Sequence, residues 1–247
     1  MMKLKDKIAI VTGAGRGIGR ATALALAQEG AHLVLAARTV SEIEIVAEEI
    51  RSVGREVLVV ATDVAKKADV VAMVQQTLER FGKVDILVNN AGVAVHNPIP
   101  DIREEDWDLN INVNLKSVFL CTQAVFTHMC GQGSGHIVNV SSLAGKYYPY
   151  KMAAYGAAKW GVVGLTGITQ EEGRPHGVRA ILVRPGPVDT KMRRDNHDDD
   201  LDKLPQPEDI AEAILLAVTQ HPRAYTPVFD VYPFEDPGGD EKVPVKK

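Results

Sequence analysis

The amino-acid sequence predicts an α/β protein in which helices cover both faces of a doubly wound parallel β-sheet. Seven short apolar runs, rich in β-branched residues, recur along the 247 residues, at 8–11, 33–35, 57–60, 84–88, 137–140, 178–183 and 228–231. Nearly continuous apolar character is typical of strands buried on both faces. Helical patterns separate these runs, and alternating strands and helices form parallel sheets through right-handed crossovers.

The helical segments are recognised by apolar residues at spacings of three and four, most clearly within 70–81, 111–129 and 210–218. Such a stripe gives a helix one buried face. Gly30 and Gly82 are expected as C-terminal glycines of two helices. Pro207, followed by two acidic residues, is typical of a first helical turn. Because the sequence contains no repeat and no linker, we expect one domain over residues 1–247.

Composition and charge exclude several classes of protein. The net charge is −4, so the chain lacks the basic field that binds nucleic acid. No apolar run approaches the roughly 18 residues of a membrane span, and the charged residues 1–6 do not begin a signal peptide. We therefore expect a cytoplasmic protein. Cys121 and Cys130 fall on opposite faces of one predicted helix, about 13 Å apart, so we expect reduced thiols.

Two segments differ from the rest in composition. Residues 193–203 contain five aspartates and one histidine and almost nothing apolar, which predicts an exposed, mobile loop within a lid at about 189–205. A solvated loop is favoured over a metal site because no second ligand cluster accompanies the aspartates, and no metal is expected. The tail at 236–247 is expected to be loosely ordered.

A glycine-rich turn follows the first predicted strand. Thr12 to Gly19 reads T-G-x-x-x-G-x-G and leads into a helix predicted over 20–29. A strand, a glycine turn and a helix N-terminus together present backbone N–H groups to an anion, and glycines allow a pyrophosphate to approach the backbone. The stricter G-x-G-x-x-G pattern fails at Ile18. A tight turn without a ligand is the alternative interpretation.

The second predicted strand ends just before Arg38, where dinucleotide-binding folds usually carry an acid for the ribose 2′-hydroxyl. Arg38, together with Arg16 of the glycine turn, could instead bind a 2′-phosphate through two guanidinium groups. The sequence therefore favours NADP(H) over NAD(H). The alternative is that Arg38 is simply an exposed residue at the start of a helix.

An acid–base pair is predicted in the alanine-rich segment 153–159. Tyr155 and Lys159 are four residues apart and share one helical face. An ammonium within about 4–6 Å can lower the phenol pKa from about 10 by about 1–3 units, which would suit proton exchange with an alcohol or ketone. A half-buried tyrosine beside a surface lysine is the alternative. The same spacing at Tyr147 and Lys151 contains Pro149, which disrupts a helix.

Polar residues follow the strands that end near this pair. Ser142 lies just past the strand 137–140, on the edge of the sheet where ligands bind in parallel folds. Its hydroxyl could hydrogen-bond a substrate carbonyl, with Ser141 an equally exposed rival. Asn112 and Asn114 interrupt an apolar helix, where an unpaired amide is unfavourable, so one of them is expected to have a function.

These residues together resemble the short-chain dehydrogenase/reductase family over nearly the whole chain, most closely from residue 5 to about 190. The motifs that carry the resemblance are Thr12 to Gly19, Asp63-Val64, Asn89-Asn90-Ala91-Gly92, Asn114, Ser142, Tyr155 with Lys159, and Pro185-Gly186. The resemblance implies a Rossmann-type sheet of about seven strands in the order 3-2-1-4-5-6-7. It also implies an NADP(H)-dependent oxidoreductase that transfers hydride between nicotinamide and a carbonyl or secondary alcohol.

The resemblance assigns roles to four residues. Tyr155 would donate the proton to the carbonyl oxygen, and Lys159 would lower the pKa of Tyr155 and hold the nicotinamide ribose. Ser142 would position the carbonyl. Asn114 would hold a water molecule that links Lys159 to solvent.

The cofactor would be held along the edge of the sheet. Asp63 and Val64 would bracket the adenine. The full predicted set is Gly13, Gly15, Arg16, Gly17, Ile18, Gly19, Arg38, Asp63, Val64, Asn90, Ala91, Gly92, Tyr155, Lys159, Pro185, Gly186, Val188 and Thr190.

Assembly and substrate are predicted in outline only. The family forms dimers or tetramers through long helices, here about 105–130 and 153–172, and an apolar outer face would drive that contact. The segment 225–233 lacks the G-x-x-x-x-V-D-G-G-like ending that is common in the family, which leaves homodimer and homotetramer both open. That ending, following residues 207–214, resembles short members that act on hydroxy acids or small ketones; a 3-oxoacyl substrate is a further expectation.

Substrate contacts are expected from residues 96–98, from the lid, and from Tyr147, Tyr148 and Tyr150, which would wall an apolar pocket or form a subunit contact. His96 is expected at the loop surface, and Trp107 and Trp160 are expected to pack. An isomerase or lyase using the same cofactor, and a catalytically silent NADP(H)-binding regulator, are the alternative functions.

Overall fold

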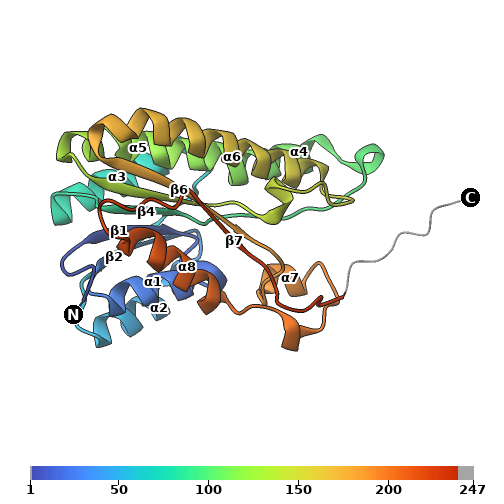
Figure 1. Cartoon of the computed structure of the whole chain (residues 1–247), viewed down its shortest axis with the longest axis horizontal. Helices are drawn as coiled ribbons and strands as arrows, with labels where there is room; N and C mark the ends of the chain where they lie inside the picture. Colours follow the sequence, from blue (N-terminus) through green and yellow to red (C-terminus); the bar gives the residue numbers. More distant parts are fainter. Residues whose placement is uncertain (1, 239–247) are drawn as a thin grey trace, which may run out of the picture.

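The computed structural model describes residues 2–238 as one seven-stranded sheet with helices on both faces (Figure 1). The strand order is β3-β2-β1-β4-β5-β6-β7, and all neighbouring strands are parallel. The strands are β1 (Ile8–Thr12), β2 (His32–Ala37), β3 (Val57–Ala61), β4 (Ile86–Asn89), β5 (Gly135–Val140), β6 (Val178–Pro185) and β7 (Val228–Val231). The predicted fold class and strand order are confirmed.

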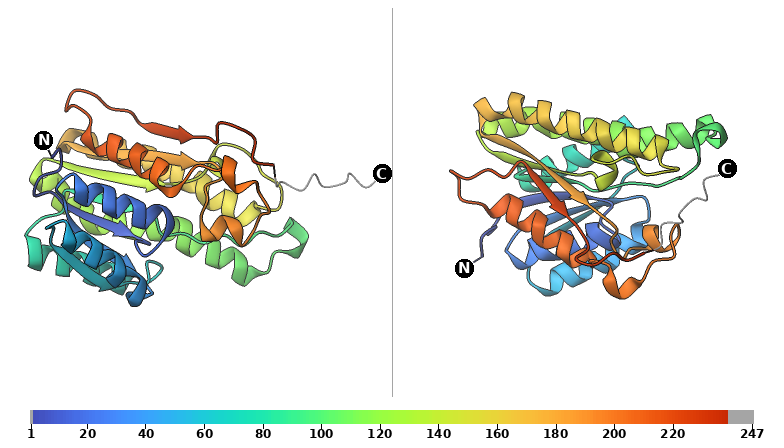
Figure 2. Two further views of the ribbon diagram at one scale, coloured as in Figure 1. Left: turned by 90° about the horizontal axis from the view of Figure 1, so that it is seen from below. Right: turned by 45° about the vertical axis from the view of Figure 1, so that its right-hand side comes forward.

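The helices form two layers. One face carries α1 (Gly17–Gln28), α2 (Val40–Ser52) and α8 (Pro207–Thr219), and Figure 2 shows α1 beside α8. The other face carries α3 (Lys67–Phe81), α4 (Glu104–Ile111), α5 (Ser117–Gln132) and α6 (Ala153–Gly173). A short helix, α7 (Lys191–Arg194), lies at one end of the molecule (Figure 1).

Alternate side chains of each central strand pack against the two helix layers. In β1, Ala9 and Val11 pack with the helices α1, α2 and α8, whereas Ile10 packs with α3 and α5. Leu33 and Val34 of β2 divide between the two layers in the same way. Because both faces of the sheet are covered, both sets of side chains must be apolar, which explains the continuous apolar runs in the sequence.

The periodicity of the apolar residues within 111–129 predicts one continuous α-helix. The structure shows an interrupted one. A five-residue π-helical segment, Asn112–Lys116, joins α4 to α5. The wider turn contains Asn114, whose buried amide bonds to the backbone of Val93 in the loop after β4. Such π-turns often occur at functional sites, and here the turn places a polar side chain on the inner side of a packed helix.

The aspartate-rich segment is less solvated than its composition predicts. The Asp199 side chain is only 1% exposed and forms a two-point ion pair with Arg193 of α7. Arg194 pairs with Asp189 in the same manner. Ion pairs within the lid therefore replace water for Asp199 and Asp189, while Asp198 and Asp200 remain exposed.

The Pro237 carbonyl accepts a hydrogen bond from the Asp200 N–H, and residues 239–247 of the predicted loose tail lie outside the described residues.

Within residues 2–238, no helix is long and apolar enough to cross a membrane. The same residues contain no group of three or more His, Cys, Asp or Glu side chains that could hold a metal ion. Cys121 is buried and Cys130 half-buried, and both are free thiols of α5.

Candidate active site

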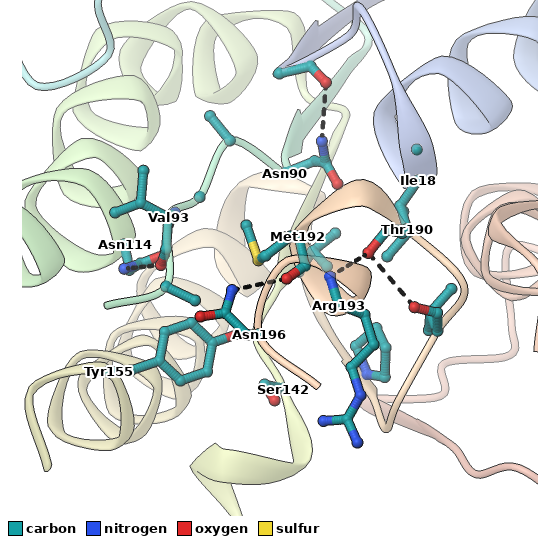
Figure 3. Close-up of a pocket in the computed structure, with 18 of the residues that line it drawn as sticks. Ile18, Asn90, Val93, Asn114, Ser142, Tyr155, Thr190, Met192, Arg193 and Asn196 are labelled. Carbon is teal, nitrogen blue, oxygen red and sulfur yellow. Dashed lines mark hydrogen bonds between the residues drawn. The ribbon is translucent and has the colours of Figure 1, made fainter. Parts of the chain in front are cut away.

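A cavity of about 1470 Å³ opens at the carboxyl edge of the sheet. Its wall combines the glycine turn, the ends of β2, β4, β5 and β6, the start of α6 and the lid residues 190–198. Every predicted catalytic and cofactor-binding residue except Gly19 lines this cavity. Of the predicted substrate contacts, Asn97, Pro98 and Tyr148 do not line it. Figure 3 shows Asn114, Ser142 and Tyr155 together with residues of the lid.

The glycine turn leaves the N-terminus of α1 open to the cavity. Gly13 and Gly17 adopt left-handed φ angles of 65° and 54°, which favour glycine. The helix begins at Gly17, three residues before its predicted start, and no side chain of the described residues caps it at Arg16. Its first N–H groups therefore face the cavity without a side-chain partner, which suits an anion such as a pyrophosphate.

Gly19 acts from behind this turn rather than in the cavity wall. A Cβ atom at Gly19 would lie 2.2 Å from the Gly13 carbonyl oxygen and 2.5 Å from Nδ2 of Asn90. The Asn90 amide in turn donates to the Thr12 carbonyl at 2.9 Å, and the Asn90 N–H donates to the Thr12 hydroxyl. Close packing of α1 thus fixes the glycine turn against the end of β4.

Arg16 and Arg38 lie at the same end of the cavity, as predicted. Arg38 is exposed just past β2, and Arg16 pairs with Glu42 at 3.3 Å. The sequence interpretation missed Glu42. This residue lies in the first turn of α2 and borders the cavity, with its carboxylate next to Gly15. The nearby Asp63 carboxylate accepts a hydrogen bond from the Ala65 N–H and so shapes the turn after β3.

Tyr155 and Lys159 lie one turn apart on α6, and the Lys159 Nζ is 5.5 Å from the Tyr155 ring centroid. Lys159 is 4% exposed and donates to the Val140 carbonyl at 3.0 Å. Burial lowers the pKa of Lys159 to about 8. Burial also raises the pKa of Tyr155, and a hydrogen bond with Ser142 opposes that rise. The lowered tyrosine pKa that the spacing predicts is therefore absent, because desolvation of the phenolate dominates.

The two serines after β5 have separate functions. Ser141 is buried, and its hydroxyl donates to the Lys159 carbonyl at 2.9 Å. Ser142 lies in the cavity wall beside Tyr155, where its hydroxyl accepts a hydrogen bond from the Ala144 N–H. Both serines border the cavity, but Ser142 is the one that hydrogen-bonds Tyr155.

Asn114 holds the loop after β4. Its Nδ2 donates to the Val93 carbonyl at 2.9 Å and its Oδ1 accepts from the Val93 N–H at 3.1 Å (Figure 3). Nδ2 also donates to the Asn110 carbonyl. Both polar atoms of the side chain therefore have partners, while Oδ1 can accept one further hydrogen bond, and the side chain fixes the cavity wall at the point where Gly92 approaches Lys159.

His96 is inside the cavity, not at the loop surface as predicted. Its ring stands edge-on to that of Tyr155, with centroids 5.8 Å apart, and a second histidine, His197 of the lid, lies 5.7 Å away. No periodic pattern indicates this placement, because residues 90–98 form an irregular loop whose direction depends on distant partners.

The tyrosine cluster divides between two surfaces. Tyr147 and Tyr150 line the cavity, whereas Tyr148 is 88% exposed and stacks on Trp160 outside it. Trp107 and Trp160 are themselves partly exposed, which differs from their predicted packing role. The loop after Ser142 is fixed to β7 because Lys146 pairs with Asp230, which also binds Arg184 at two points.

The chain is similar to several known proteins. The family model described as short chain dehydrogenase matches residues 7–201. An uncharacterised oxidoreductase of Staphylococcus aureus (strain MRSA252) is 39% identical over 89% of this chain and 94% of its own length. One of Listeria monocytogenes is 40% identical over 77% of this chain and 78% of its own.

Solved structures are similar as well. A metagenomic short-chain oxidoreductase in complex with NADP is 37% identical, with a TM-score of 0.83 over 94% of this chain and 99% of its own. A levodione reductase is 30% identical, with a TM-score of 0.86 over 92% of this chain and 96% of its own. The chain belongs to the short-chain dehydrogenase/reductase family of oxidoreductases.

Proposed function

We propose that the protein is an NADP(H)-dependent reductase of small carbonyl compounds, or equally a dehydrogenase of the corresponding secondary alcohols. The observation that carries the proposal is the cluster of Tyr155, Lys159 and Ser142 in the same cavity as an open helix N-terminus and two arginines. A silent regulator would not need an acid–base pair in that position. The similarity to a levodione reductase supports carbonyl chemistry.

A bound nicotinamide would supply or accept the hydride, and the chain's own residues would handle the proton. Ser142 hydrogen-bonds the carbonyl oxygen and holds it beside the Tyr155 hydroxyl. Tyr155 donates its proton to that oxygen as the carbonyl carbon is reduced, which yields the alcohol. A raised phenol pKa keeps Tyr155 protonated and ready for reduction.

Lys159 would assist as an electrostatic partner. Its ammonium lies near the Tyr155 ring and favours the phenolate that remains after proton transfer. Asn114 positions the wall next to Lys159, and we propose that it also holds the water molecule that returns a proton to this pair.

The choice of NADP(H) is supported by Arg16 and Arg38 and by the similarity to a structure with NADP. Two guanidinium groups suit a 2′-phosphate, whereas an unphosphorylated ribose would leave these groups without an anionic partner. Glu42 forms an ion pair with Arg16, so binding of the phosphate would replace a carboxylate already next to this arginine.

We further propose that the protein is a cytoplasmic homo-oligomer, a dimer or tetramer. Large apolar side chains stay exposed on the outer helices, including Phe119 of α5 and Ile168 of α6. Small molecules are the proposed substrates, and nucleic acid and membranes are not proposed as partners.

A panel of ketones, diketones and hydroxy acids, assayed with NADPH or NADP⁺ by absorbance, tests the activity. We expect NADPH consumption with at least one small ketone, at a rate well above that with NADH. Turnover with none of them, in either direction, would refute the oxidoreductase proposal for this substrate class.

The cofactor choice is tested separately by Arg38→Ala. Loss of one charge-assisted contact to phosphate is expected to raise the KM for NADPH by about 10–100-fold while the KM for NADH changes little. Arg51→Ala, an exposed arginine of α2 outside the cavity, serves as the matched control. A wild-type preference for NADH, or an equal change for both cofactors in Arg38→Ala, contradicts the assignment.

A further inference from the structure

His96 is a cavity residue for which the reaction proposed above has no task. The backbone on both sides of it is fixed, because Asn110 donates to the Val95 carbonyl at 3.3 Å and Asn97 pairs with Met152 in an isolated parallel bridge. The imidazole stands edge-on to Tyr155, the proposed proton donor. The fold therefore places this ring next to the reacting centre and does not leave it to a free loop.

The ring has an unsatisfied polar atom. His96 Nε2 is buried and has no hydrogen-bond partner among residues 2–238. Buried side-chain nitrogens nearly always have a partner, so an exception inside a cavity indicates a group that binds there. Burial, followed by the positive charges of His197 and Arg193, lowers the pKa of His96 to about 4. The imidazole is accordingly neutral near pH 7 and carries one N–H donor.

We propose that His96 is a specificity-determining residue that hydrogen-bonds a second oxygen of the substrate, adjacent to the carbonyl that Tyr155 protonates. The inference rests on the proposed function. It narrows the substrate class to carbonyl compounds with a neighbouring oxygen, such as vicinal diketones, α-hydroxyketones and α-keto esters. A substrate oxygen suits this position because a neutral imidazole presents an N–H donor that an oxygen lone pair can accept.

The cavity offers such a substrate a way to reach His96. The ring of the lid residue His197 is tilted by 57° relative to that of His96, with centroids 5.7 Å apart, and both histidines line the cavity. His197 belongs to the segment after α7, which packs at the end of the sheet and not within it. Both histidines thus border the space in which a ligand of this cavity would bind.

The test compares two ketones with the same carbon skeleton, diacetyl with adjacent carbonyl groups and butanone with one. His96→Phe keeps an aromatic ring against Tyr155 and removes the nitrogen, and His96→Gln restores an amide near the Nε2 position. His176→Phe, at an exposed histidine at the opposite edge of the sheet, is the matched control. NADPH-dependent kcat and KM are measured for each protein with both ketones.

We expect His96→Phe to lower kcat/KM for diacetyl by about tenfold, the effect of one lost hydrogen bond, with less than about a twofold change for butanone. His96→Gln is expected to recover most of the diacetyl activity. Equal losses for both ketones would show that the ring only packs against Tyr155, and unchanged kinetics would show that Nε2 binds nothing; either result overturns the inference while the wild type remains an active reductase. A wild type that reduces no carbonyl compound overturns the proposed function as well.

Discussion

Lys159 is a buried amine, and burial makes its protonated, positively charged form unfavourable. It is 4% exposed, bonds to the Val140 carbonyl, and has a pKa of about 8 instead of 10.5. Between these two values the unfolded chain holds a proton that the folded chain lacks, so stability rises with pH through this window. Below about pH 8 the folded protein carries the full penalty. A residue needed for chemistry is thus a source of instability at neutral pH.

Lys159→Met is therefore expected to stabilise the protein while it abolishes turnover. The lowered pKa of Lys159 corresponds to a burial penalty of about 3 kcal/mol at pH 7, which the substitution removes. The lost hydrogen bond to Val140 costs about 1 kcal/mol, so the free energy of unfolding should rise by about 2 kcal/mol. Above pH 10.5, where the amine is neutral in both states, the gain should disappear and the loss of about 1 kcal/mol for the hydrogen bond should remain. Urea unfolding at pH 7 and at pH 11 measures this, with the exposed Lys67→Met as control. An equal gain at both values would show that side-chain packing, not charge, is responsible.

Single residues also show which properties of the site a local sequence pattern can predict. The four-residue spacing correctly placed Tyr155 near Lys159, because helical geometry is local. The direction of the Tyr155 pKa was predicted wrongly, since burial is set by segments far away in the chain. Glu42 was missed, and His96, although expected among the substrate contacts, was placed at the loop surface, for the same reason: each reaches the cavity through a loop or a first helical turn whose direction no local pattern determines.

At the scale of elements, the contact between α1 and the glycine turn shapes the cofactor end of the cavity. The turn is fixed by two left-handed glycines in front and by Gly19 behind, where the Gly13 carbonyl leaves no room for a Cβ atom. Because that carbonyl is backbone, it cannot yield as a flexible side chain would. A change at Gly19 should therefore be transmitted to the anion site.

Gly19→Ala is expected to destabilise the protein by about 1–3 kcal/mol through overpacking and to weaken NADPH binding at least tenfold. Gly131→Ala in α5 is the matched control, because a Cβ atom there meets nothing within 4 Å. At that position the same change should be neutral or slightly stabilising. Thermal unfolding and fluorescence titration with NADPH separate the two effects. Full NADPH affinity in Gly19→Ala would show that the contact does not shape the site.

Elements with one buried stripe or a continuous apolar run were predicted well, since period and composition are local properties. All seven strands lie within a few residues of the predicted runs. The π-segment at Asn112–Lys116 was not predicted, because the apolar period continues through it and only the bond between Asn114 and the loop at Val93 reveals it. The paired charges of Asp199 and Arg193 likewise depend on a folded lid, which composition alone describes as solvated.

At the scale of the whole molecule, the strand order brings distant motifs to one edge. Thr12 ends β1, and Asn90 and Ser142 follow β4 and β5; the three strands are neighbours in the sheet although the residues are far apart in sequence. The alternation of strands and helices predicted a parallel sheet, but the strand order came from the family resemblance. Tertiary pairing that no single segment encodes is what assembles the cavity.

Assembly of several copies is expected through the outer face of α5 and α6. Ile168 is 58% exposed on α6, and burying it in a subunit contact would be favourable. Light scattering is expected to give a dimer or tetramer, and Ile168→Glu is expected to shift it toward monomer. Ile45→Glu, at a similarly exposed isoleucine on α2, should leave the mass unchanged. A monomeric wild type, or equal effects of both substitutions, would contradict this interface.

The most direct test of the central claim is the rate of NADPH-dependent carbonyl reduction by Tyr155→Phe. If the phenol donates the proton, turnover should fall by about 10²–10⁴ while NADPH binding, measured by fluorescence, is retained. Tyr148→Phe removes the same hydroxyl from an exposed tyrosine outside the cavity and should keep wild-type turnover. Undiminished reduction by Tyr155→Phe would contradict the account.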